Sequence, residues 1–231
     1  MNNNGFYNEG NLSKFRAALE NAFALVESGE DIRVRISKAN SKMGNVASVS
    51  TLPFLTCPAT CSSTCGAKCY AAKLAALRPS VLASWAYNTA VAIRRPELYW
   101  TQVDAAIKGI RFFRFHVSGD IMNADYFMHM IDVARNNPHA QILAFTKRFE
   151  IVNAWIASNG SLPSNLHIMF SGWSNLTPVN PYHIPETNVI ERGHEPEKDW
   201  TLCGGNCFEC AIAGAGCWAA KPGETIAFHI H

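Results

Sequence analysis

The chain has 231 residues, of which 48% are hydrophobic and 16% are charged, and its formal net charge is +2. This length suits one large domain or a main domain with a small appendage, and the apolar content excludes a disordered chain. The apolar runs are too short for a membrane span, and the charge gives no clear electrostatic footprint for nucleic acid. The first five residues lack the basic start and apolar stretch of a signal peptide, so we expect a cytoplasmic protein without a membrane partner.

Hydrophobic periodicity predicts the elements of the first half of the chain. In chain order we expect a helix over 11–28, strands over 32–36 and 46–52, and helices over 71–77, 79–93 and 96–107. Pro79 and Pro96 favour helix starts, because proline suits the first turn of a helix. These patterns predict a helix-rich N-terminal half.

The second half alternates short strands with helices. We expect a strand over 112–117, a helix over 123–134, a strand over 142–146, a helix over 149–157, and strands over 166–170 and 225–230. Alternation with short turns is typical of βαβ units, so the sequence predicts an α/β protein with a parallel sheet. Residues 174–187 are rich in Pro, Asn and Ser and predict a long loop.

The eight cysteines form two groups. The first quartet is Cys57, Cys61, Cys65 and Cys69, and the second quartet is Cys203, Cys207, Cys210 and Cys217. We expect three regions: an N-terminal lead and helix in 1–30, a core with the first quartet in 31–185, and a cysteine-rich segment in 186–231 that packs on the core.

Three kinds of chemistry suit such quartets. Disulfides belong mainly to short exported chains, and bridges within so short a window would close very small loops. Four thiolates can bind Zn²⁺, and Cys207 and Cys210 have the two-residue gap of a zinc knuckle. Closely spaced cysteines with small residues between them can also wrap around an iron–sulfur cluster. This pattern favours two [4Fe–4S] clusters, with zinc as the alternative at either quartet.

Polar residues follow the predicted strands at their carboxyl ends. These residues are Ser118, Gly119 and Asp120, then Thr146, Lys147 and Arg148, then Ser171, Gly172, Trp173 and Ser174. In parallel sheets this end is where ligands bind, so we expect them to line one site beside the first quartet. Ordinary turn chemistry and helix caps are the alternative explanation for each of them.

A cysteine loop after an early strand, followed by β/α units, resembles the radical S-adenosylmethionine enzymes. Within that type the chain is similar to a phage-encoded family known as gene product eighty-eight. The matching runs are Cys65 and Cys69 with Tyr70 and Ala71, Phe115–Asp120, Phe145–Lys147 and the cysteine-rich C-terminus. The resemblance covers about residues 32–217 and implies an incomplete β/α barrel, because the chain has few strands for a complete one. It also implies that the protein is located in the cytoplasm of a bacterial host infected by the phage.

The resemblance also implies roles for the site residues. Cys61, Cys65 and Cys69 would bind a cluster with one open iron, and the second quartet would bind an auxiliary cluster. Tyr70 and the strand-end residues would bind S-adenosylmethionine, a small-molecule cosubstrate. These strand-end residues are Ser118, Gly119, Asp120, Thr146, Lys147 and Ser171. An electron donor would be a further partner. If Cys57 completes the first set of ligands, no iron is open, and the protein is then an electron carrier. A zinc-stabilised phage interaction protein is the further alternative.

Overall fold

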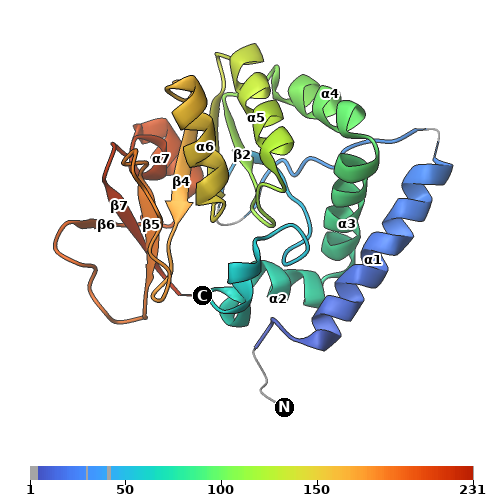
Figure 1. The fold of residues 1–231 in the computed structure, drawn as a ribbon, viewed down its shortest axis with the longest axis horizontal. Coiled ribbons are helices and arrows are strands. Elements are labelled where there is room, and N and C mark those ends of the chain that lie inside the picture. Colours follow the sequence, from blue (N-terminus) through green and yellow to red (C-terminus); the bar gives the residue numbers. More distant parts are fainter. Residues whose placement is uncertain (1–4, 30, 41–42, 231) are drawn as a thin grey trace.

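The computed structural model describes residues 5–29, 31–40 and 43–230 (Figure 1). Its helices are α1 (Glu9–Ser28), α2 (Tyr70–Leu77), α3 (Pro79–Arg94), α4 (Pro96–Ile107), α5 (Ala124–Asn136), α6 (Phe149–Asn159) and α7 (Cys207–Ala213). Its strands are β1 (Ala47–Val49), β2 (Phe112–Phe115), β3 (Gln141–Thr146), β4 (Leu166–Ser171), β5 (Glu186–Ile190), β6 (Trp200–Leu202) and β7 (Thr225–His229). Short 3-10 helices lie at η1 (Ala59–Ser62), η2 (Gly66–Lys68) and η3 (Gly216–Trp218). No helix within these described ranges has the length and apolar character needed to cross a membrane.

The strands of the described residues form one seven-stranded sheet in the order β1-β2-β3-β4-β5-β7-β6. All neighbouring strands are parallel, and β1 and β6 are the two edges. Parallel neighbours need crossover connections, and α5 and α6 supply those from β2 to β3 and from β3 to β4. The predicted α/β class with a parallel sheet is therefore confirmed.

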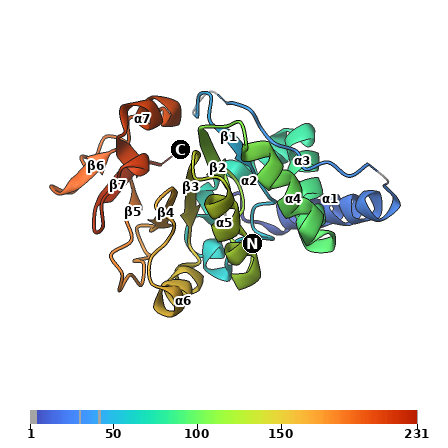
Figure 2. The same ribbon diagram turned by 90° about the horizontal axis from the view of Figure 1, so that it is seen from above.

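Side chains alternate along each strand and so divide the sheet into two faces. Phe113 and Phe115 of β2 and Ile142 of β3 belong to a large core shared with α1 to α6. Phe112 of β2 and Leu143 of β3 point the other way, into a smaller core shared with α7 and η3. Figure 2 accordingly shows α5 and α6 on one side of the strands and α7 on the other.

The predicted helices of the first half and the two after it are all present as α1 to α6. Their starts have local causes: the side chain of Asn8 accepts a hydrogen bond from the amide of Asn11, and Asn123 does the same for Tyr126. Pro79 and Pro96 stand in the first turns of α3 and α4, as predicted. Periodicity and the two prolines were therefore sufficient to locate these helices, although the caps themselves were not predicted.

The predicted strand over 32–36 is wrong. The amide of Val34 donates to the side chain of Gln102 at 2.7 Å, and the amide of Arg35 donates to that of Asn88 at 2.8 Å. These side chains replace the strand neighbour that the alternating pattern suggested, and the segment stays extended without joining the sheet. The alternation of apolar and polar residues here reflects burial of one side of the segment and not pairing with a neighbouring strand.

The C-terminal part adds more sheet than the sequence indicated. β5 begins within the predicted loop 174–187, and β6 and α7 were not predicted as elements. Residues 186–231 thus contribute β5, β6 and β7 to the same sheet as the core. At the other end, residues 1–4 of the expected N-terminal lead lie outside the described residues, and the amide of Phe6 donates to the carbonyl of Ala67 at 3.1 Å.

The turn after β2 is locked against the segment that leads into the first quartet. Gly119 has a φ of +84°, and a Cβ there would overlap the hydroxyl of Thr51 and lie 2.6 Å from that of Thr56. Those hydroxyls share a hydrogen bond of 3.1 Å, and the amide of Asp120 donates to Thr56 Oγ1 at 3.3 Å. Packing and backbone conformation both require glycine at this position.

We predict that Gly119→Ala lowers the free energy of unfolding by about 3 kcal/mol, since it adds a left-handed backbone penalty to a steric overlap. The matched control is Gly160→Ala, because Gly160 has a φ of +90° and a Cβ added there would meet no heavy atom within 4 Å. That control should lose about 1 kcal/mol. Urea denaturation measures both values, and equal losses would contradict the packing explanation.

Candidate functional site

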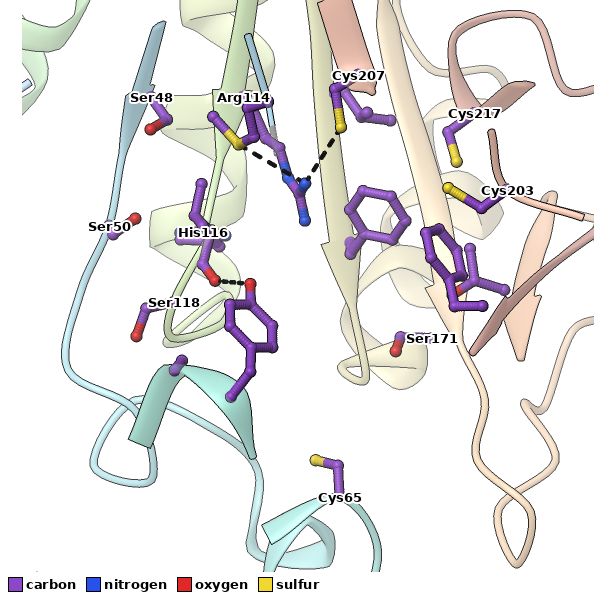
Figure 3. Close-up of a pocket in the computed structure, with 18 of the residues that line it drawn as sticks. Ser48, Ser50, Cys65, Arg114, His116, Ser118, Ser171, Cys203, Cys207 and Cys217 are labelled. Atoms are coloured by element: carbon purple, nitrogen blue, oxygen red, sulfur yellow. Dashed lines mark hydrogen bonds between the residues drawn. The ribbon is translucent and has the colours of Figure 1, made fainter. Parts of the chain in front are cut away.

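A cavity of about 930 Å³ lies on the sheet face that carries Arg114, Leu143 and Ile226, away from α5 and α6 (Figure 3). All eight cysteines of the first and second quartets line this cavity. Figure 3 shows Cys65 at its lower end and three residues of the second quartet at its upper right. The structure thus brings both quartets to one space, although the sequence separates them widely.

The first quartet is held by two 3-10 turns and the start of a helix. Cys61 lies in η1, Cys65 immediately precedes η2, and Cys69 caps α2, where its sulfur accepts from the amide of Ala72 at 3.4 Å. A Cβ on Gly66 would lie 2.6 Å from the carbonyl oxygen of Cys61, so the turn between these cysteines depends on glycine.

Three thiols of the first quartet, those of Cys61, Cys65 and Cys69, have raised pKa values. The thiol of Cys61 forms hydrogen bonds with those of Cys57 and Cys65. Donation of a hydrogen bond to Cys57, followed by burial, raises the pKa of Cys61, and donation to Cys61, followed by burial, raises the pKa of Cys65. Burial raises the pKa of Cys69 to about 11. Burial disfavours the charged thiolate, while the nearby charge of Lys147 lowers the pKa of Cys65 and Cys69 and so opposes this shift in part.

The second quartet surrounds a short helix that packs on the sheet. Asn206 caps α7 by accepting from the amides of Phe208 and Glu209. The indole of Trp218 donates to the carbonyl of Cys207 at 3.0 Å and packs against Phe112 of β2. These contacts fix α7 and η3 over the sheet, so that their cysteines line the cavity.

The thiols of the second quartet influence one another as those of the first do. Burial raises the pKa of Cys217 to about 12, and the neighbouring Cys203, Cys207 and Cys210 add to the shift. Within the described ranges, however, no three histidine, cysteine or acidic side chains are gathered closely enough to hold a metal ion. The cysteines are therefore brought to one cavity without being assembled around a single point.

The strand-end residues predicted to bind a cosubstrate line the same cavity. They are Ser118, Gly119, Asp120, Thr146, Lys147 and Ser171, and Tyr70 joins them. The hydroxyl of Tyr70 donates to the carbonyl of Val117. The sequence therefore identified a set of residues that the fold does bring together.

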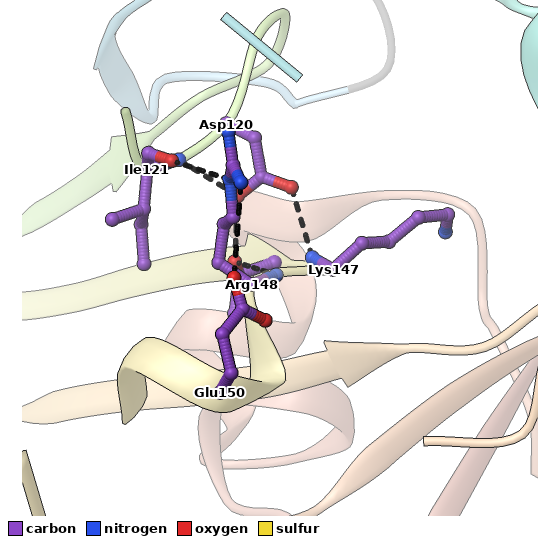
Figure 4. A network of polar contacts seen from close by, with 6 residues as sticks. Asp120, Ile121, Lys147, Arg148 and Glu150 are labelled. Carbon is purple, nitrogen blue, oxygen red and sulfur yellow. Dashed lines mark hydrogen bonds and ion pairs between the residues drawn. The ribbon is translucent and has the colours of Figure 1, made fainter. Parts of the chain in front are cut away.

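Asp120 links the ends of two strands (Figure 4). Its carboxylate accepts from the amide of Ile121 at 2.7 Å, from the hydroxyl of Thr146 at 2.6 Å and from the amide of Lys147 at 2.9 Å. Burial raises the pKa of this carboxyl group, while these hydrogen bonds oppose the shift. Much of the hydrogen-bonding capacity of Asp120 is thus used to tie β2 to β3.

Lys147 extends this connection to the next strand. Its ammonium group donates at 2.7 Å to both the carbonyl and the hydroxyl of Ser171, at the end of β4. It also lies 5.9 Å from the centre of the Trp173 ring. Lys147 is buried, and its charge lowers the pKa of Asp120. The two side chains therefore lie together in the buried wall of the cavity.

His116 and Ser118 lie buried at the end of β2. His116 has a φ of +59°, and its Nε2 lies 3.1 Å from the hydroxyl of Tyr126, which in turn lies 3.0 Å from that of Tyr99. Burial lowers the pKa of His116 to about 3, so the ring is neutral at neutral pH. Among the described residues, His116 Nδ1 and Ser118 Oγ have no hydrogen-bond partner.

Arg114 is a charged cavity residue that was not among the candidates from the sequence. It stands on β2 between Phe113 and Phe115, and its guanidinium reaches into the cavity toward Cys207 (Figure 3). An arginine between apolar residues of a strand buried on both faces is a signal that the sequence offered, because such a charge needs a special environment.

A comparison with protein families tests the resemblance. The family model named gene product 88 matches residues 12–202, which include the whole first quartet and all the strand-end residues of the cavity. Comparisons with curated proteins and with solved structures gave no match. On this family match, the chain belongs to the phage-encoded gene product 88 family.

Proposed function

We propose that the protein is an iron–sulfur protein with two [4Fe–4S]-type clusters and a radical S-adenosylmethionine-like activity on a small molecule. One observation carries this proposal: all eight cysteines line a single cavity of about 930 Å³. That volume lies within the range of small-molecule sites. Eight soft sulfur donors around such a space favour soft metals and their clusters over hard cations.

The chemistry of the donor set fits a cluster at each quartet. Within each quartet the cysteines are separated by small residues such as Gly66, Gly204 and Gly216, which let the backbone approach a cluster. The raised thiol pKa values mean that binding must displace protons, which is the usual coupling of metal affinity to pH. Each quartet needs a local rearrangement, because its thiols do not yet converge.

We assign Cys61, Cys65 and Cys69 as the ligands of the first cluster and the second quartet as the ligands of an auxiliary cluster. A cluster with an open iron supplies one electron for the reductive cleavage of S-adenosylmethionine. The chain supplies the position: Asp120 ties the strand ends together, and Lys147 adds a positive charge beside the first quartet. In this proposal the open sheet is a partial barrel with the cosubstrate at its carboxyl end.

A non-catalytic electron carrier is the second candidate, and Cys57 favours it. Cys57 lines the cavity, and its thiol is hydrogen-bonded to that of Cys61. A fourth thiolate at this place would complete the ligands of the first cluster. S-adenosylmethionine would then have no open iron.

We predict that anaerobic reconstitution with iron and sulfide gives a brown protein with about eight iron atoms per chain. Cys65→Ala and Cys210→Ala should each retain about four, since each removes a ligand from one quartet. Ser63→Ala is the matched control, because Ser63 lies in the same loop and carries no thiol. Iron and sulfide assays measure these values. A colourless protein with stoichiometric zinc would instead identify the zinc-stabilised alternative.

We predict that the reduced protein converts S-adenosylmethionine to 5′-deoxyadenosine, and that Cys57→Ala retains both the first cluster and this activity. The reason is that three cysteines suffice for a cluster with an open iron. Chromatography of the product and paramagnetic resonance of the cluster give the two readouts. Unchanged resonance and no product in the wild type would favour the electron carrier, and loss of the cluster in Cys57→Ala would show that Cys57 is a ligand.

A further inference from the structure

Arg114 is a positive charge inside the cavity with sulfur and aromatic neighbours. Its Nη1 lies 3.8 Å from Cys207 Sγ and 3.8 Å from Met43 Sδ. Its guanidinium carbon lies 4.4 Å from the centre of the Phe145 ring. The Nε atom is buried and has no hydrogen-bond partner among the described residues. Sulfur atoms are weak acceptors, so the strong donors of this arginine are poorly satisfied.

The other charged side chains of the cavity have partners. Lys68 forms an ion pair of 2.9 Å with Glu191, and Lys147 lies near Asp120 and donates to Ser171. By contrast, no acidic side chain of the described residues forms an ion pair with Arg114. Among the described residues, Arg114 is therefore a cavity cation that has neither an ion pair nor a strong hydrogen-bond acceptor, and its burial is costly unless a ligand supplies the counter-charge.

The walls near Arg114 are apolar. Leu143, Ile226 and Trp218 line the cavity on the same face of the sheet, and Phe145 packs against the guanidinium itself. A ligand here would thus place a charged group on Arg114 and an apolar part against these side chains. Water is a poor substitute, because it brings no charge.

We propose that this end of the cavity binds a small organic anion, with an apolar body and one carboxylate or phosphate group that contacts Arg114. Both groups present the oxygen pair that a guanidinium binds bidentately. Arg114 lies on the second quartet's side of the cavity, away from Cys65, so this anion is a molecule separate from the cosubstrate at the first quartet (Figure 3). Binding of the anion needs no cluster, and only a role for the anion as the substrate would rest on the proposed function.

The test is equilibrium dialysis of the purified full chain with three probes that share a naphthalene body: 1-naphthoate, 1-naphthyl phosphate and neutral 1-naphthamide. At least one of the two anions should bind about tenfold or more tightly than the amide, since a charge-assisted pair is worth that factor. The preferred anion distinguishes carboxylate from phosphate. Equal binding of all three by the wild type would overturn the proposal.

Variants assign the effect to the residue. Arg114→Met should abolish the preference for the anion and leave the binding of the amide unchanged, and Arg114→Lys should keep part of the preference. The control is Arg111→Met, because Arg111 is exposed, does not line the cavity and stacks on Phe112. A preference that persists in Arg114→Met would place the anion on another cation and overturn the assignment. Circular dichroism verifies the fold of each variant.

Iron content separates this inference from the proposed function. Iron is assayed in each sample after attempted reconstitution. Protein that takes up no iron yet shows the Arg114-dependent preference would refute the iron–sulfur function and support the anion site. Protein that takes up both clusters, but shows no preference for the anions with or without them, would support the iron–sulfur function and refute the anion site.

Discussion

A parallel sheet must be covered on both faces, and the way this protein meets that requirement determines its site. Helices α1 to α6 share the core on one face, with Phe113 and Phe115 of β2 pointing into it. The opposite face has no such layer of helices among the described residues: α7 and η3 pack there instead, and a cavity remains that the loop of the first quartet also lines. Segments that carry cysteines therefore border this cavity on both sides. The two quartets therefore meet because of the sheet, and the spacing of cysteines along the chain plays no part in their meeting.

The fold was predictable wherever an element has a pattern of its own. Helices with apolar stripes and side-chain caps, such as α1 and α5, follow from the sequence, and so do the apolar strands β2, β3 and β4. β5 reads Glu-Thr-Asn-Val-Ile and β6 has only three residues at an edge, so neither shows an apolar run that could reveal it. The segment over 32–36 has the pattern of a strand, but side chains from α3 and α4 take its amide hydrogens. Such long-range contacts leave no local signal.

The sequence predicted most of the residues of the site but fewer of their roles. Cysteine spacing and the carboxyl ends of the strands pointed to residues most of which line one cavity, whereas Arg148 and Ser174 were expected there and do not line it. The roles within it depend on contacts that only the fold creates. Asp120 accepts hydrogen bonds from Thr146 and Lys147 at the end of β3, and Lys147 donates to Ser171 of β4, so these residues connect the ends of three strands in the wall of the cavity. This network gives the first quartet a rigid neighbour, which a site for chemistry needs.

Arg114 couples the second quartet to the proposed anion, because both lie at the same end of the cavity. A guanidinium has five N–H donors, so one arginine can contact the sulfur of Cys207 and an organic anion at once. Thiolates of the second quartet and the anion would both place negative charge beside this cation. Negative charge at either place changes the interaction of Arg114 with the other. By linkage this coupling is reciprocal. The charge at the second quartet changes the affinity for the anion, and the bound anion changes the relative free energies of the charge states of that quartet. In this arrangement binding of the anion changes the charge preference of the second quartet, because both interact with Arg114, whose hydrogen-bond donors have only weak acceptors.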